Sequence, residues 1–542
     1  MAPTAVEKLL ALLFWAAVGL LFAVFRVLSR PNAAAPVRKL PPVANPLLLL
    51  SATQLAKKIR RREVSSVEVV QAYIDRIQDV NPLINAVIKD RFDAALQEAA
   101  QVDKLIEEET DGEEVLEDRL PLLGVPLSVK SSYAFQGMPF TSGLRSRSGV
   151  VASVDAPPLT LLKKAGAIPL VTTNTSELCM WLESHNHLHG ITNNPYDLER
   201  IPGGSSGGEG SLLGAAGSVI GVGSDIGGSI RIPAFFNGIF GHKTTSAKGV
   251  VSSENQYPPS SGRHKEYLSL GPMCRYAEDL KPMLKIMAGP NAHMLSLNAS
   301  VDLKKLRFFT IPHDSGSVWT NAVSEELMEV QRKVVERLEA DLGVRVQEVC
   351  FPELSHSFQI WDTYMRLPDD EGNPPTSFSK LMGEPGRPAW PAWELLKRTV
   401  GKSDHTVAAI GLGLMEWTEA SAPSQSTVQM KERLQKKVDE LLGTDGVFLY
   451  PSHPRVAPRH HHPLFRPFDF AYTGILNTLG LSVTQCPLGL GEEGLPLGVQ
   501  VVAGRLQDHL SLEVALFLEK AFGGWREPGS PATNADGAEQ AS

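Results

Sequence analysis

Hydrophobic and polar positions follow a helical period in the first part of this chain. Apolar residues recur at helical spacing over residues 67–77, and Ser65 and Glu68 stand where a capping box would begin that helix. The dipeptide Asn81-Pro82 is expected to end it, because proline removes a backbone donor and clashes with the preceding turn. A second helix is predicted over residues 92–106.

Further along, short apolar runs alternate with helical stretches. The pattern predicts strands over residues 121–129, 167–171, 218–222, 306–311 and 446–450, and helices over residues 157–165, 211–216 and 325–342. Strands that alternate with helices indicate an α/β domain with a largely parallel sheet. The apolar stretch over residues 390–417 fits a core helix, a wall of a substrate channel or a membrane-facing cap.

The N-terminus carries the longest apolar run of the chain. Twenty residues from Leu9 to Leu28 would span about 30 Å at roughly 1.5 Å each. A cleaved signal peptide would have a core of about 7–15 residues, and this run is longer, is uncharged from Leu9 to Phe25 and exits into Arg26, Arg30, Arg38 and Lys39. We therefore predict a retained single-pass transmembrane helix. The basic residues after it place the body of the protein in the cytosol, on intracellular membranes.

Composition narrows the function further. The net charge of -8 over 542 residues gives no basic surface for nucleic acid. The four cysteines are scattered, which indicates buried thiols rather than a disulfide framework. His453 and the run His460, His461 and His462 lie among prolines, where adjacent histidines do not present a tetrahedral ligand set, so a metal site is disfavoured.

Two glycine clusters that carry serines are the best candidates for chemistry. They cover residues 203–210 and 223–231, and Ser205 and Ser229 lie 24 positions apart. Serine beside exposed backbone amides indicates a nucleophile next to an oxyanion hole. Two flexible linkers are the alternative, which the long apolar flanks disfavour. A phosphate-binding loop fails because Glu209 stands where lysine is required, and the dinucleotide spacing fails because Ile226 replaces the third glycine.

Together with Lys130, which ends the first predicted strand and would by itself be expected to reach solvent, these clusters resemble the amidase signature family. The resemblance rests on residues 203–209 and 225–233, and on a lysine 75 positions before Ser205. It covers residues 51–524. We accordingly expect an N-terminal transmembrane anchor over residues 1–30, a Pro/Ala-rich linker over 31–50, one amidase catalytic domain over 51–525 and a disordered tail over 526–542.

The resemblance implies an α/β fold in which a large mixed β-sheet is covered by helices on both faces. Within the family, the chain is most similar to the membrane-anchored members that hydrolyse fatty-acid amides. This implies a lipid amide substrate such as oleamide or anandamide and a membrane as partner, with no cofactor and no metal. It leaves a homo-oligomer open. The alternatives are an amidase for small polar amides, a transamidation subunit, or an inactive lipid-binding member.

The resemblance also implies a catalytic triad. Ser229 would attack the amide and form an acyl-enzyme, while its proton passes to Ser205, on a cis peptide, and then to Lys130. A lysine accepts a proton only when it is neutral, so Lys130 should be buried and its pKa lowered. The residues 177–180 align with a family stretch that lines the acyl pocket.

Other residues are assigned supporting roles by the same resemblance. The oxyanion would bind the backbone amides of Ile226, Gly227, Gly228 and Ser229. Ser206 is a second relay donor or a structural hydroxyl, and Asp225 and Arg231 are expected to pair and hold the loop. The sequence departs from the family at Ser131, where an acidic residue is common, and at Thr244, where a proline is expected.

Overall fold

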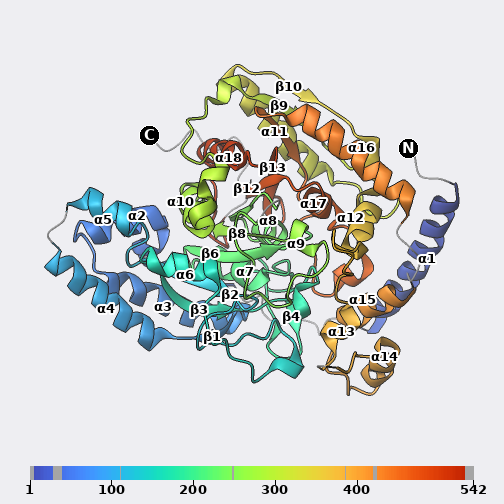
Figure 1. The fold of residues 1–542 in the computed structure, drawn as a ribbon, viewed down its shortest axis with the longest axis horizontal. Helices are drawn as coiled ribbons and strands as arrows, with labels where there is room; N and C mark the ends of the chain where they lie inside the picture. Colours follow the sequence, from blue (N-terminus) through green and yellow to red (C-terminus); the bar gives the residue numbers. More distant parts are fainter. Residues whose placement is uncertain are drawn as a thin grey trace.

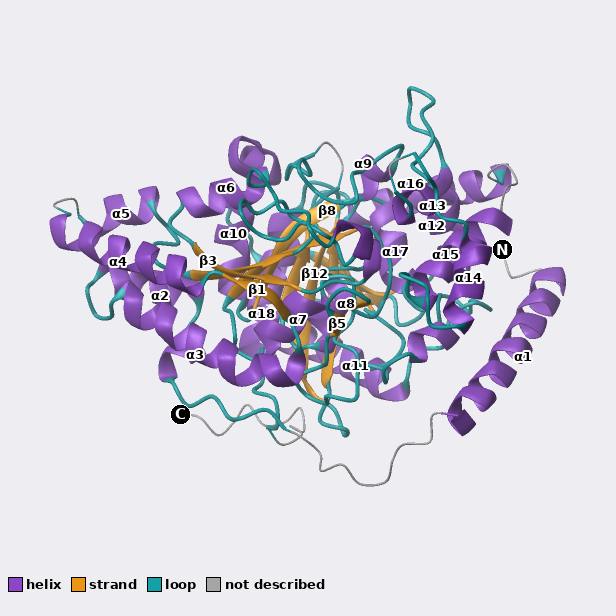
Figure 2. Ribbon diagram, turned by 90° about the horizontal axis from the view of Figure 1, so that it is seen from below, coloured by secondary structure: helices purple, strands orange, loops and turns teal. Residues whose placement is uncertain are grey.

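The computed structural model describes residues 5–28, 39–109, 112–246, 249–384, 386–418 and 424–530. Strands run through the middle of the molecule, with helices above and below them in Figure 2. Within these residues, eleven strands form one sheet in the order β1-β3-β2-β6-β8-β7-β12-β13-β11-β9-β10. Figure 1 shows how the N-terminal helices α2 to α5 lie at one end of this sheet.

The sheet is mixed. Parallel pairs join β2 to β3 and β6, and β9 to β10 and β11, whereas the other neighbours are antiparallel. The strands are β1 (Val87–Asp90), β2 (Pro126–Lys130), β3 (Ile168–Thr173), β6 (Ile220–Asp225), β7 (Phe240–Lys243), β8 (Ser269–Cys274), β9 (Arg307–Thr310), β10 (Val346–Glu348), β11 (Gly446–Tyr450), β12 (Ser482–Leu490) and β13 (Pro496–Ala503), and β4 (His185–Asn186) and β5 (Gly190–Ile191) form a separate pair. The expectation of a largely parallel sheet is wrong, and the mixed sheet implied by the family resemblance is confirmed.

A short connection accounts for one of the antiparallel pairs, β12 with β13. Only residues 491–495 separate β12 from β13, which is too short for the crossover that parallel strands need. The pattern of apolar residues did not single out this pair. All residues of both strands are buried, so neither shows the polar and apolar alternation of a half-exposed strand.

The helices of the described residues are α1 (Ala5–Leu28), α2 (Ala52–Arg60), α3 (Ser66–Ile84), α4 (Phe92–Glu108), α5 (Glu113–Arg119), α6 (Pro157–Lys164), α7 (Gly207–Gly214), α8 (Arg231–Phe236), α9 (His264–Tyr267), α10 (Leu280–Ala288), α11 (Glu325–Leu342), α12 (Ser357–Arg366), α13 (Phe378–Met382), α14 (Pro391–Thr399), α15 (Val407–Thr418), α16 (Gln425–Leu442), α17 (Ala471–Thr478) and α18 (Asp508–Phe522). The capping box is confirmed, because the Ser65 hydroxyl accepts from the Glu68 amide and the Glu68 carboxylate accepts from the Ser65 amide. Asn81-Pro82 does not end α3. Pro82 lies in the last turn of the helix, where few hydrogen bonds remain to be lost.

The predicted transmembrane helix is not found. Helix α1 covers the predicted stretch, yet no helix in the described ranges is long and apolar enough to cross a membrane. The Trp15 indole of α1 donates to the Val318 carbonyl at 2.9 Å, and Phe14 packs against Trp319 and Phe468. Residues 29–30 of the predicted anchor, residues 31–38 of the predicted linker and residues 531–542 of the predicted tail lie outside the described residues.

Strand β6 brings the two glycine clusters together. The first cluster runs into α7, which packs against β6, and the second cluster is the loop that connects the end of β6 to α8. Strand β2 lies parallel to β6, with Val129 opposite Val222, so Lys130 emerges beside the start of the second cluster. The fold therefore brings all three predicted reactive side chains together near the carboxyl ends of the inner strands β2 and β6.

Candidate active site

Lys130 is the last residue of a strand with neighbours on both sides. It pairs with Thr173 of β3, and its side chain is fully buried. The ammonium nitrogen Nζ donates to Ser205 Oγ at 2.7 Å and to Ser224 Oγ at 3.0 Å. Burial lowers the pKa of Lys130 below its ordinary value, because the charged form loses its hydration, although Cys179, Asp225 and Glu209 act in the opposite direction.

Hydrogen bonds to its backbone carbonyl hold Ser205 beside Lys130. The Gly204–Ser205 peptide is cis, and the Ser205 carbonyl accepts from Thr175 Oγ1 at 2.7 Å and from Ser184 Oγ at 3.2 Å. A side chain at Gly204 would collide with the backbone, since its Cβ would lie 2.3 Å from the Trp181 carbonyl oxygen. Glycine is therefore required beside Ser205.

The loop from Ile226 to Ile230 carries Ser229 and the amides beside it. The Ile226 carbonyl accepts from the Trp361 indole at 2.9 Å, and the Gly227 carbonyl accepts from Thr473 Oγ1 at 2.7 Å. Because the N–H of a trans peptide points away from its C=O, fixing these carbonyls also fixes the amides that follow them. Gly228 has φ +124°, and a Cβ there would lie 2.1 Å from Thr473 Oγ1, so only glycine fits.

The four predicted oxyanion amides are not equivalent. The Gly228 N–H donates to Asp225 Oδ1 at 2.8 Å. The amides of Ile226, Gly227 and Ser229 have no acceptor within the part of the chain that the structure describes, and these three residues line the same cavity.

Asp225 and Arg231 pair as expected. Both side chains are fully buried, with 2.9 Å between Arg231 Nη2 and Asp225 Oδ1. Burial alone would raise the pKa of Asp225, but the Arg231 guanidinium lowers it well below its ordinary value. Asp225 also accepts from the Ile230 amide at 3.1 Å, so the pair fixes the shape of the loop.

Neighbouring polar groups complete the setting. Ser206 and Ser131 have buried hydroxyls without a partner among the described atoms, and Thr244 donates to the Leu270 carbonyl at 2.9 Å. Glu209 lies behind Lys130 and accepts from Ser128 Oγ at 2.5 Å. Burial raises the pKa of Glu209 to about 7.

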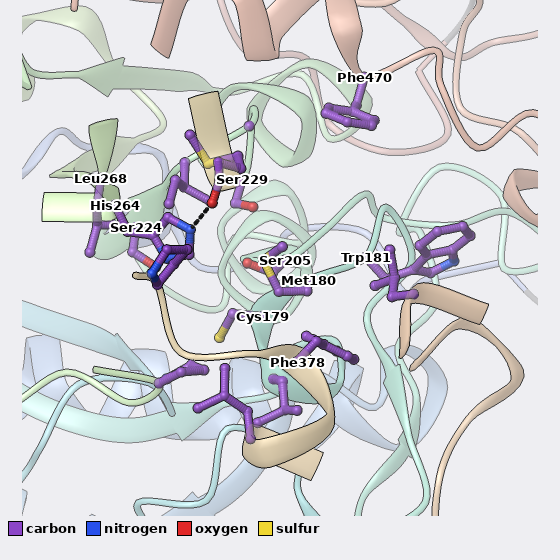
Figure 3. A pocket seen from close by; sticks show the side chains of 18 of the residues that line it. Cys179, Met180, Trp181, Ser205, Ser224, Ser229, His264, Leu268, Phe378 and Phe470 are labelled. Carbon is purple, nitrogen blue, oxygen red and sulfur yellow. Dashed lines mark hydrogen bonds between the residues drawn. The ribbon is translucent and has the colours of Figure 1, made fainter. Parts of the chain in front are cut away.

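A cavity of about 280 Å³ lies beside Ser205 and Ser229. Its volume is near the lower end of the ~300–1,000 Å³ usual for ligand sites. Ser205, Ser224 and Ser229 lie on its wall, and Figure 3 shows Trp181, Phe378 and Phe470 around the same space. Further apolar side chains come from α12 and α15, among them Phe358, Leu412 and Met415. The site thus combines a small polar centre with a long apolar lining. It suits an uncharged substrate with a large apolar part.

Sequence reasoning missed several residues that build this site. Ser224, the second acceptor of Lys130, lies inside the second glycine cluster and could have been found from its position one residue before Asp225. Trp361 and Thr473 come from distant helices, and nothing in the local pattern marks them. Of the histidines weighed and disfavoured as metal ligands, His460 and His461 contact Glu183, and the described residues hold no group of three potential ligands placed to bind a metal ion.

Comparisons with known proteins agree with this geometry. A family model described as Amidase matches residues 68–512. Fatty-acid amide hydrolase 2-A of Danio rerio is 66% identical over 529 residues, which are 98% of this chain and 99% of that protein. Fatty-acid amide hydrolase 2 of Homo sapiens is 53% identical over 514 residues, covering 94% and 96% of the two chains. A solved fatty acid amide hydrolase shares the fold with a TM-score of 0.68 at 23% identity, covering 89% of this chain and 86% of that one.

Proposed function

The chain belongs to the amidase family, and we propose that this amidase hydrolyses long-chain fatty-acid amides with Ser229 as its nucleophile. The observation that carries the proposal is the hydrogen bond from buried Lys130 to Ser205, which lies with Ser229 on the wall of an apolar cavity. The two relatives at 66% and 53% identity, which are named fatty-acid amide hydrolases, support the same substrate class.

Acylation would begin with proton transfer. Neutral Lys130 takes the hydroxyl proton of Ser205, and Ser205 takes that of Ser229, whose oxygen attacks the amide carbonyl carbon. The carbonyl oxygen becomes an oxyanion that the amides of Ile226, Gly227 and Ser229 stabilise. The Gly228 amide supports the loop instead, because it already donates to Asp225.

Collapse of the tetrahedral intermediate returns the proton. Lys130 gives it back through Ser205 to the departing nitrogen, the C–N bond breaks, and ammonia or an amine leaves. A water molecule then repeats the sequence on the acyl-enzyme: it loses a proton through the same relay and releases the fatty acid from Ser229. Lys130 serves as base and acid in turn. Its lowered pKa supports this role, because neutral and charged forms must both be accessible near the working pH.

We also propose that the protein works at an intracellular membrane. Helix α14 exposes Trp393 by 49% and Leu396 by 55%. Val400, just after its end, is 65% exposed, and Lys402 adds positive charge nearby. Helix α1 exposes Leu12 by 66%, and both views place α1 and α14 at the same end of the molecule (Figures 1 and 2). Exposed aromatic and aliphatic side chains with basic neighbours favour insertion into the surface of a bilayer. Binding to anionic vesicles, lost when Trp393 and Leu396 are replaced by Ser, would test this proposal.

The substrate class is tested by turnover. Purified full-length protein in detergent or vesicles should hydrolyse oleamide and anandamide with kcat/KM far above that for acetamide, and Ser229→Ala should abolish both activities. Preference for acetamide-sized amides would instead support an amidase for small polar substrates. Binding of lipid amides without turnover by the wild type would support an inactive lipid-binding protein.

A further inference from the structure

A buried carboxyl group on Glu177 joins the catalytic segment to the helices that cover the cavity. Glu177 is 3% exposed, and its partner His405 is 7% exposed. His405 Nδ1 lies 2.6 Å from Glu177 Oε1, and the Thr406 backbone N–H donates to Glu177 Oε2 at 2.8 Å. Both carboxylate oxygens are therefore committed to one short segment, more than two hundred residues away in sequence.

The segment that Glu177 holds is the start of α15. The Thr406 hydroxyl accepts from the Ala409 amide at 3.2 Å, as a helix cap does. Six and nine residues after Thr406, Leu412 and Met415 of the same helix line the cavity. Glu177 therefore fixes where one apolar wall of the cavity begins.

On its other side, Glu177 lies within the segment that supports the reactive serines. Thr175 Oγ1 donates to the Ser205 carbonyl, and Cys179 and Met180 line the cavity beside Ser205. Leu178 packs with Ile410 of α15 in a small apolar cluster, so the two segments are in contact beyond the hydrogen bonds. Any displacement of Glu177 would change the distance between the apolar wall and the catalytic centre.

The same network continues into α14. The His405 amide donates to Ser403 Oγ at 3.2 Å, and Ser403 Oγ donates to Glu394 of α14 at 2.8 Å. Taking such a pair out of water is costly, and apolar residues of similar volume are often as stable or more stable in its place. The hydrogen bonds of Glu177 therefore contribute more to the position of α15 than to the stability of the fold.

We propose that Glu177 is a positioning residue that sets the selectivity for acyl-chain length, by holding α15 through His405 and Thr406 at a fixed place relative to Ser229. A long chain extends along the wall that α15 provides, and a short chain ends before it reaches that wall. The inference rests on the proposed function, since it assumes that the apolar lining receives the acyl chain.

Turnover of two primary amides that differ only in chain length tests the proposal. Glu177→Ala should lower kcat/KM for oleamide relative to butyramide by about tenfold or more, while kcat/KM for butyramide stays within about threefold of wild type. Glu177→Gln keeps an acceptor for the Thr406 amide, so its ratio of kcat/KM for oleamide to kcat/KM for butyramide should lie between those of the wild type and Glu177→Ala. His405→Ala should shift the ratio in the same direction as Glu177→Ala.

Asp279 supplies a matched control. Its buried carboxylate accepts from the amides of Ala52 and Thr53 at the start of α2, at 2.9 Å each, and it does not line the cavity. Asp279→Ala should lower the unfolding temperature and leave the oleamide-to-butyramide ratio unchanged. If Glu177→Ala lowers kcat/KM equally for oleamide and butyramide, or if Asp279→Ala shifts the oleamide-to-butyramide ratio as much as Glu177→Ala does, the proposal is overturned.

Labelling of Ser229 separates this inference from the proposed function. Butyl and dodecyl fluorophosphonates react with an activated serine without any amide being hydrolysed, and the ratio of their labelling rates reports chain-length selection directly. Wild-type protein that labels but hydrolyses no amide would refute the proposed function alone. An unchanged labelling ratio in folded Glu177→Gln and His405→Ala proteins would refute the role of Glu177, whether or not Glu177→Ala folds.

Discussion

Replacing Lys130 by Met tests the proton relay with the least change in shape. Methionine keeps most of the apolar stem and removes the nitrogen that donates to Ser205 at 2.7 Å and to Ser224 at 3.0 Å. The acylation of Ser229 then has no base, and general bases contribute typically about 10²–10⁴-fold to a rate. At about 1.4 kcal/mol for each factor of ten, the transition state should lose about 3–5 kcal/mol of stabilisation.

The effect on folding should be smaller than the effect on the rate. The variant leaves two buried hydroxyls with one partner fewer, at a cost of about 1–3 kcal/mol each, but it also removes an amine whose charging is opposed by burial. These changes oppose each other. We therefore expect a folded protein whose unfolding midpoint in urea lies close to that of the wild type.

The dependence of the rate on pH gives the sharper assay. Burial lowers the pKa of Lys130 below its ordinary 10.5, so kcat/KM of the wild type should rise with pH as the lysine loses its proton and level off below pH 10.5. Lys130→Met should be slow throughout and should lack this rise. Its rate constants are measured with oleamide, and intact mass confirms the substitution.

A second buried lysine provides the control. Lys243 donates to the Leu481 carbonyl at 2.7 Å, it does not line the cavity, and burial lowers its pKa to about 7. Lys243→Met should change stability and leave the rise of kcat/KM with pH in place. If Lys130→Met keeps the wild-type rate and the same rise, the base is another group and the relay is refuted.

Three further variants probe the loop and the buried acid. Asp225→Asn leaves Arg231 buried with a weakened partner and should cost about 3–5 kcal/mol of stability by urea unfolding; a loss below about 1 kcal/mol would contradict the pairing. Gly228→Ala places a methyl group 2.1 Å from Thr473 Oγ1 at φ +124° and should slow fluorophosphonate labelling of the folded protein by at least about tenfold; unchanged labelling would show that the loop geometry is not critical. Glu209 has a pKa raised from 4.5 to about 7, so it binds more protons in the native state than in the unfolded state in that window and should by itself lower wild-type stability by about 3 kcal/mol as pH rises through it; Glu209→Gln should make the fall shallower by that amount, because burial also raises the pKa of Asp279 and Glu519, and an unchanged slope would refute the role of Glu209.

The sequence predicted local structure well where a segment carries its own signals. Ser65 and Glu68 mark the start of α3 by hydrogen bonds within the first turn, and the structure contains both bonds. Helix α11 has the predicted bounds, since its apolar stripe repeats over five turns. The direction of the strands could not be predicted in the same way, because it depends on which distant strand each one meets.

In the candidate site, too, features marked by local residues could be predicted, whereas features that depend on distant contacts could not. The glycine clusters indicate a site within residues 203–231, and the resemblance to the family singles out Ser205 and Ser229, whose roles stay predictions. Asp225 and Arg231 form the expected pair. Lys130 by itself resembles a surface lysine at the end of a strand, and only its place between β3 and β6 buries it. No signal in the sequence links Glu177 to His405, since their contact joins two segments more than two hundred residues apart.

The most direct test of the account is the identity of the residue that carries the acyl group during turnover. Wild-type protein mixed with excess oleamide is quenched in acid within the first turnovers, digested and analysed by mass spectrometry. The account predicts an oleoyl ester on the peptide that contains Ser229, and none in Ser229→Ala. An oleoyl group on another side chain, such as the Cys179 thiol in the same cavity, or retained oleamide hydrolysis by Ser229→Ala, would contradict it.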